Sequence, residues 1–150
     1  MNMSNNYTTI YQICRQTAGM TQERAAELLG VATRTLAAWE SGERPVPDLR
    51  VADMVDLYGT PYLALQHLRL YSPLGPKVLP PVDRVPLPQA VCQLFKATAD
   101  IEKARVKDQL IQIAADGRVD ELEEKEFEAL LIQLEPLISA VLAIRYAEEV

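Results

Sequence analysis

The chain has 150 residues, of which 49% are hydrophobic, a composition that suits one compact domain or two small ones. Its net charge of −6 has the wrong sign for a protein that covers much of a nucleic acid non-specifically, so any such contact must come from locally placed basic residues. The polar N-terminus lacks a secretory signal pattern, and no stretch approaches about 18 continuous apolar residues. We therefore expect a soluble cytoplasmic protein with no membrane partner.

Residues that often carry catalysis or bind metals are sparse. Cys14 and Cys92 lie far apart without metal-ligand spacing, and we expect both to be buried thiols. His67 is the single histidine and has no evident Ser, Cys or carboxylate partner, so we expect a surface or packed side chain. The sequence therefore predicts a protein that is not an enzyme and that needs no cofactor or metal.

Helical periodicity dominates the first half of the chain, and strand patterns are almost absent. The predicted helices span about residues 7–18, 21–29, 32–40, 48–58 and 60–70. Oxygen atoms in the side chains of Thr21, Asp48 and Thr60 are expected to cap the second, fourth and fifth helices. Gly30 supplies the left-handed residue that a tight turn between the second and third helices requires.

A proline-rich segment separates the two halves of the chain. Six of the ten prolines fall within residues 72–88, a density that forbids a helix and predicts a semi-rigid linker. Residues 89–150 are predicted to form two long helices, the first ended by Gly117 and the second capped by Asp120 and kinked or broken at Pro136. Each helix carries one apolar stripe, and a two-helix hairpin cannot cover both stripes alone. We therefore expect this hairpin to contact another chain or the N-terminal domain.

The two segments around the predicted turn carry a specific motif. Residues 21–31 read T-Q-E-R-A-A-E-L-L-G-V, and residues 35–45 read T-L-A-A-W-E-S-G-E-R-P. In composition and register they resemble the phage-repressor helix-turn-helix family (Cro and Xre type), over roughly residues 7–70. The resemblance implies an all-α fold, in which a five-helix, lambda-repressor-like DNA-binding domain (residues 1–71) precedes the linker and the C-terminal hairpin.

The resemblance also implies which side chains meet DNA. The implied contact residues are Thr21, Gln22, Thr33, Arg34, Ala37, Ala38 and Arg44. Gln22 would hydrogen-bond a phosphate at the start of the second helix, and Arg44 would hold the sugar-phosphate backbone just beyond the third. Arg34 is the expected sequence reader, because a guanidinium can bond guanine O6 and N7 together, which is worth roughly 1–3 kcal/mol of discrimination.

Other positions bear on how the third helix is held. Arg15 and Glu40 match a pair that in this family forms an ion pair tying the first helix to the third. The family usually has serine or threonine where this chain has Ala32, so the third helix lacks its usual hydroxyl cap. Thr33 is the alternative cap, a role that would take its side chain away from DNA.

These expectations favour a dimeric, sequence-specific transcriptional regulator, a repressor that reads the major groove of double-stranded DNA with the helix from about Ala32 to Glu40. Residues 1–71 hold six arginines, no lysine and seven acidic residues, so one copy should bind weakly and two copies on adjacent half-sites are expected. The C-terminal helices are the expected homodimer contact and a possible site for another protein. The alternative is an antitoxin-like or adaptor module that binds protein instead of DNA, which intramolecular ion pairs of Arg34 and Arg44 would favour. A weaker hypothesis is a regulator with a ligand pocket between its C-terminal helices.

Overall fold

The computed structural model describes residues 9–148, and this part of the chain is all-α, as the sequence predicts. Its helices are α1 (Ile10–Thr17), α2 (Gln22–Leu28), α3 (Thr33–Glu40), α4 (Asp48–Tyr58), α5 (Tyr62–Tyr71), α6 (Gly75–Val78), α7 (Leu87–Lys103), α8 (Val106–Ile113), the 3-10 helix η1 (Ala114–Asp116) and α9 (Glu124–Arg145). Residues 9–148 contain no β-strand, only an isolated bridge between Pro86 and Glu148. The chain divides into two compact units between Lys77 and Val78, and each has its own apolar core.

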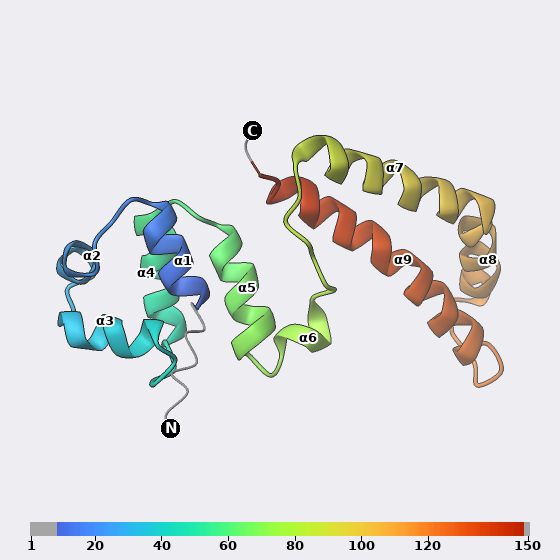
Figure 1. Cartoon of the computed structure of the whole chain (residues 1–150). Helices are drawn as coiled ribbons and strands as arrows, with labels where there is room; N and C mark the ends of the chain where they lie inside the picture. The colour runs from blue at the N-terminus through green and yellow to red at the C-terminus, as the bar shows by residue number, and fades with distance from the viewer. Residues whose placement is uncertain (1–8, 149–150) are drawn as a thin grey trace, which may run out of the picture. The chain divides into compact units, whose positions relative to one another are not determined.

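Helices α1 to α5 of the first unit enclose one core (Figure 1). Its fully buried side chains include Leu36, Met54 and Leu63, and burying each from water stabilises the fold by roughly 1.5–3 kcal/mol. Trp39, the single tryptophan, is buried in the same core. The predicted start of the first helix at Tyr7 lies outside the described residues.

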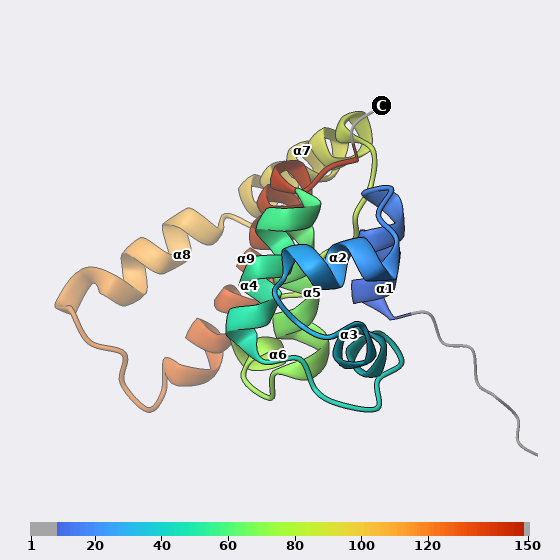
Figure 2. The same ribbon diagram turned by 90° about the vertical axis from the view of Figure 1, so that its left-hand side faces the viewer.

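The turn between α2 and α3 follows the predicted chemistry. Thr21 caps α2 by accepting a hydrogen bond from the backbone N–H of Arg24 at 3.2 Å, and Gly30 adopts a left-handed φ of +65°. Figure 1 shows α2 end-on and α3 from the side, whereas Figure 2 shows α2 from the side and α3 end-on. The two helices therefore run in clearly different directions, as a helix-turn-helix requires.

Two of the predicted caps in the first unit are wrong. α4 begins at Asp48 without a side-chain cap, and the carboxylate Oδ1 of Asp48 instead lies 3.0 Å from Nε2 of His67. Because the His67 ring is buried, its nitrogens require partners, and the carboxylate satisfies one of them. The hydroxyl of Thr60 donates to the carbonyl oxygen of Tyr58 and does not cap α5.

The predicted linker contains a short helix, which the sequence argument excluded. α6 begins at Gly75, and Pro76 occupies its first turn, where a missing backbone N–H costs no helical hydrogen bond. Gly75 is buried because its backbone lies directly on the carbonyl group of Leu68 in α5, where a Cβ atom would overlap. The absence of a side chain at this position therefore permits the contact.

In the second unit, α7 and α9 lie side by side and antiparallel, with α8 at one end of the pair (Figure 1). The prediction of one long helix before Gly117 is wrong, because the chain breaks at Arg105, which has a left-handed φ of 53°. The predicted Asp120 cap of α9 is also wrong, because the N-cap position is Glu123, which makes no side-chain cap hydrogen bond. Asp120 instead accepts the backbone N–H groups of the two residues that precede the helix. α9 then continues through Pro136 without a break.

Two surface properties differ from the predictions. Cys14 is buried, but Cys92 is exposed on α7. α9 is long and apolar enough to cross a membrane by length and composition, with a mean hydropathy of 1.8 over 18 residues, of which 17% are buried. Glu135 and Pro136 interrupt the apolar sequence of α9, so it does not form one continuous apolar run. Four large apolar side chains of α9 are exposed: Leu131, Ile132, Ile138 and Val141.

Candidate nucleic-acid interface

The position of α3 is set by close packing against α2. Ala25 and Ala26 are fully buried, and their small side chains let the two helices approach each other. The backbone N–H of Val31 donates to the carbonyl of Ala26 at 3.0 Å, which closes the turn. On the other side of the turn, Arg50 of α4 donates through Nη1 to the carbonyl of Leu29 at 3.3 Å. These contacts fix where the first residues of α3 lie.

A buried ion pair fixes the other end of α3. The guanidinium of Arg15 donates to Glu40 through two nitrogens, Nε to Oε1 at 2.7 Å and Nη2 to Oε2 at 2.9 Å. Its Nη1 donates to the carbonyl of Met20 at 2.7 Å, in the turn between α1 and α2. The hydrogen bonds with Glu40 raise the pKa of Arg15 above its ordinary value, so the pair stays charged. The arrangement ties α1 to α3, as the resemblance implies.

Gln22 is bound to the same carboxylate. Its Nε2 atom donates to Oε2 of Glu40 at 3.0 Å, and the side chain is half-buried. A side-chain amide carries two N–H groups, so one of them remains for a further acceptor. The site therefore holds Gln22 in a fixed orientation at the first position of α2.

The solvent exposure of its side chains shows which face of α3 points outward. Thr33 and Arg34 are exposed and Ala37 is half-buried, whereas Ala38 is 8% exposed. Ala38 does not lie on the outward face, and its carbonyl oxygen accepts the backbone N–H of Arg44 at 3.1 Å. The predicted base contact of Ala38 conflicts with this burial.

Ser41 takes the outward position that the prediction assigned to Ala38. It is exposed and lies seven residues beyond Arg34, on the same side of the helix. The sequence carried this signal, because a helical period of 3.6 starting from Arg34 reaches Ala37 and then Ser41. The motif pattern alone did not show whether Ala37 or Ala38 faces outward.

Thr33 does not cap α3. The cap position is Ala32, whose backbone is extended and which makes no side-chain hydrogen bond, while Thr33 is the first residue of the helix. The Thr33 side chain therefore stays on the exposed surface beside Arg34.

Arg34 and Arg44 differ from the other arginines of the first unit. Both are exposed, and within residues 9–148 neither side chain makes a hydrogen bond or an ion pair. In contrast, Arg24 pairs with Glu27 at 2.7 Å, and Arg50 pairs with Asp53 at 3.0 Å. The two guanidinium groups at opposite ends of α3 therefore keep all their donors for an external acceptor.

Acidic residues limit the positive potential of this face. Glu23 and Glu43 are exposed close to Gln22 and Arg44 in the sequence. Two unpaired guanidinium groups against these carboxylates give a local field too weak for tight non-specific binding to a phosphate backbone. Contacts with particular groups of a nucleic acid must therefore supply much of any affinity for it.

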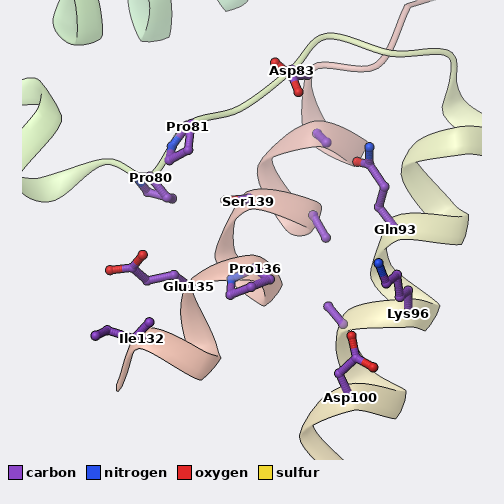
Figure 3. Close-up of a pocket in the computed structure, with 13 residues that line it drawn as sticks. Pro80, Pro81, Asp83, Gln93, Lys96, Asp100, Ile132, Glu135, Pro136 and Ser139 are labelled. Carbon is purple, nitrogen blue, oxygen red and sulfur yellow. The ribbon is translucent and has the colours of Figure 1, made fainter. Parts of the chain in front are cut away.

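A groove lies in the second unit, between α7, α9 and residues 80–83 (Figure 3). Its volume is about 550 Å³, and Gln93, Lys96 and Asp100 extend from α7 toward it. Three small side chains form its floor: Ala97, Ala140 and Ala143. Its volume is typical of ligand sites. Among the described residues, however, no buried polar side-chain atom in the groove lacks a partner, so nothing marks a specific ligand.

Comparison with known proteins finds a similarity, and it lies in the first unit. Residues 12–68 match the family model of a helix-turn-helix domain, from within α1 to within α5. No curated protein and no solved structure matches the chain. Over these residues the first unit is therefore similar to a helix-turn-helix domain.

Proposed function

We propose that the protein is a sequence-specific transcriptional regulator, a repressor of the phage or mobile-element type, that reads the major groove of double-stranded DNA with α3. The observation that carries this proposal is the state of Arg34 and Arg44, which are exposed and unpaired within residues 9–148. Leaving two such groups unpaired at the ends of one helix brings no stability to the fold. It suits a surface that meets an anionic, hydrogen-bonding partner.

The side chains on the outward face of α3 contact the edges of the bases. Arg34 lies in the first turn, where a recognition helix approaches the base edges, and its fork can bond O6 and N7 of one guanine. Thr33 supplies a hydroxyl beside it. Ala37 offers a methyl to a thymine methyl. The Ser41 hydroxyl donates to the carbonyl oxygen of Ala38 at 3.2 Å, so one turn further on it offers its oxygen as an acceptor.

Backbone contacts flank this reading face. Arg44 reaches a phosphate beyond the end of α3, and Gln22 presents the amide N–H that Glu40 leaves unused. Thr21 lies next to Gln22 and holds the start of α2 through its cap. These contacts set the register of α3 on the duplex, whereas Arg34 selects the base.

The regulator acts as a homodimer in the cytoplasm. Residues 1–71 carry a net charge of −1, so one copy makes few phosphate contacts and binds weakly. Two copies on half-sites roughly 34 Å apart combine their affinities and produce a two-fold symmetric operator. The C-terminal unit supplies the dimer contact, because its helices expose much apolar surface.

The alternative function, a module that binds protein instead of DNA, draws less support. Its expected signature is intramolecular pairing of Arg34 and Arg44, and neither arginine has such a partner within residues 9–148.

Selection from a pool of random DNA duplexes, at low and at moderate salt, tests the proposal. Wild type should enrich a two-fold symmetric site, and binding should weaken with salt. Arg34→Lys keeps the charge but loses the guanidinium fork, so it should retain the salt dependence and relax the preference at one base pair per half-site. Lys103→Ala removes one charge from an exposed position on α7 and should leave the enriched site unchanged. A folded wild type that enriches no sequence even at low salt would leave the protein-binding module as the better account.

A further inference from the structure

The contacts of α9 within the second unit use only one face of the helix. The inner face includes Phe127, Leu130 and Leu134, which pack on α7 and α8 within the same unit. A second set of positions, spaced alternately by four and three residues, lies along the helix beside the inner face. This outer seam consists of Glu124, Glu128, Leu131, Glu135, Ile138, Leu142 and Arg145.

The outer seam is open to solvent. Leu131 is 40% exposed and Ile138 is 50% exposed, and Leu142 is half-buried. Figure 3 shows Glu135 extending from the side of α9 that faces away from α7. A spacing of four and three over three heptads is the pattern by which one helix packs along another.

The charges of the outer seam are segregated along the helix. Glu128 lies in the N-terminal part of the helix, Glu135 lies near its centre, and Arg145 is its last residue. All three side chains are exposed, and none has an ion-pair partner within residues 9–148. A parallel pair of such helices would place each of these charges opposite its like, whereas an antiparallel pair can place Glu128 opposite Arg145.

We propose that the outer seam of α9 pairs antiparallel with the outer seam of a second copy of this chain. With the two-fold axis between Pro136 and Leu137, Glu128 lies opposite Arg145 of the partner subunit. In the same register, Leu131 lies opposite the partner's Leu142, and Ile138 lies opposite the partner's Glu135. Each contact occurs twice by symmetry. The inference specifies the dimer contact of the regulator and rests on the function proposed above.

The charge pattern also favours a protein partner over a lipid surface. Although α9 has the length and mean hydropathy of a spanning helix, Glu135 lies near its centre and Glu128 and Arg145 lie on the same seam. Ionisable side chains are costly in hydrocarbon, whereas in the proposed helix pair Glu128 faces Arg145 of the partner subunit.

Sedimentation velocity of the full chain over a range of concentrations, without DNA, tests this pairing. Wild type should form a dimer, and Glu128→Arg or Arg145→Glu should each weaken self-association by about tenfold, because each change places like charges opposite each other twice. The double variant Glu128→Arg/Arg145→Glu should recover most of the wild-type affinity, because the opposite charges then face each other again. Lys103→Glu, a charge reversal at an exposed position of α7, is the matched control and should leave the dimer unchanged.

Four results would overturn the proposal. The folded wild type could stay monomeric, or its dimer could be weakened by neither single charge reversal. The double variant could self-associate no more tightly than the single variants. Finally, the wild type could pellet with phosphatidylcholine–phosphatidylglycerol vesicles and not dimerise. Circular dichroism of each variant verifies that its helices are intact. Because the measurement contains no DNA, a failure of pairing is distinguishable from a failure of DNA reading by the first unit.

Discussion

The Nε2 atom of Gln22 lies 3.0 Å from Oε2 of Glu40, the same carboxylate that binds the buried guanidinium of Arg15. One acidic side chain at the end of α3 thus orients a residue at the start of α2 and ties both to α1. The proposed phosphate contact of Gln22 and the stability of the first unit therefore depend on the same ion pair.

Removing one half of this pair should be costly. Arg15→Ala leaves the Glu40 carboxylate buried without its counter-charge, and we expect the free energy of unfolding to fall by about 3–5 kcal/mol. Urea unfolding followed by the fluorescence of Trp39 measures this loss, because Trp39 is the single tryptophan and lies in the core of the first unit.

The double variant Arg15→Met/Glu40→Leu is the control for this interpretation. It removes both charges and keeps apolar volume, so it should recover most of the lost stability. A double variant as unstable as Arg15→Ala would mean that the packing of these side chains matters more than the charge left unpaired.

Tyr58→Phe should not destabilise the protein. The Tyr58 hydroxyl is buried, and among the described residues it is the buried side-chain polar atom without a hydrogen-bond partner. Its removal relieves a desolvation penalty, and we expect the free energy of unfolding to stay unchanged or rise by up to about 1 kcal/mol.

Tyr11→Phe is the matched comparison. The buried Tyr11 hydroxyl lies 2.8 Å from Nδ1 of His67, so its loss should cost about 1–2 kcal/mol. Equal losses in the two variants, measured by urea unfolding, would contradict the assignment of the Tyr58 hydroxyl as unsatisfied.

The same tyrosine predicts a pH dependence above neutrality. Burial raises the pKa of Tyr58 from 10.0 to about 12, with a smaller contribution from the Glu40 carboxylate. The unfolded chain therefore loses this proton before the folded chain does, and the free energy of unfolding falls as pH rises from 10.0 to about 12. Tyr58→Phe should flatten that decline by up to about 3 kcal/mol relative to wild type. Urea unfolding at several pH values measures the difference, and parallel profiles for the two proteins would refute the shift.

Ala32→Ser should stabilise α3. Ala32 occupies the N-cap with an extended backbone and no side-chain hydrogen bond, so a serine hydroxyl there can accept from a free backbone N–H of the first turn. We expect a gain of about 1 kcal/mol in the free energy of unfolding. Ala37→Ser, inside the same helix, is the control and should lose about 0.5 kcal/mol. No gain at Ala32 would show that the first turn of α3 is already satisfied.

The sequence predicted the local structure of the first unit well, for physical reasons. The Thr21 cap and the left-handed Gly30 are decided by neighbouring residues, and these two features set the bounds of α2 and the turn after it. Burial within α3 depends on what packs beneath the helix, and so the orientation of Ala38 was predicted wrongly.

Features that depend on distant partners were not predictable from local patterns. Asp48 fails as a cap because it binds His67, 19 residues away in the sequence. Arg105 breaks the predicted long helix in a left-handed conformation that non-glycine residues seldom adopt. The proposed DNA contacts follow from the family resemblance and the exposed arginines, and they remain predictions.

The central claim is that Arg34 reads a guanine in the major groove. A double-mutant cycle that combines a change in the protein with a change in the base tests it most directly. Wild type and Arg34→Ala are titrated with the selected duplex and with a duplex in which the guanine opposite Arg34 carries carbon in place of N7. Wild type should lose on the order of tenfold in affinity on the modified duplex, whereas Arg34→Ala should bind both duplexes equally and weakly. Equal losses by the two proteins, or no loss by wild type, would contradict base reading by Arg34.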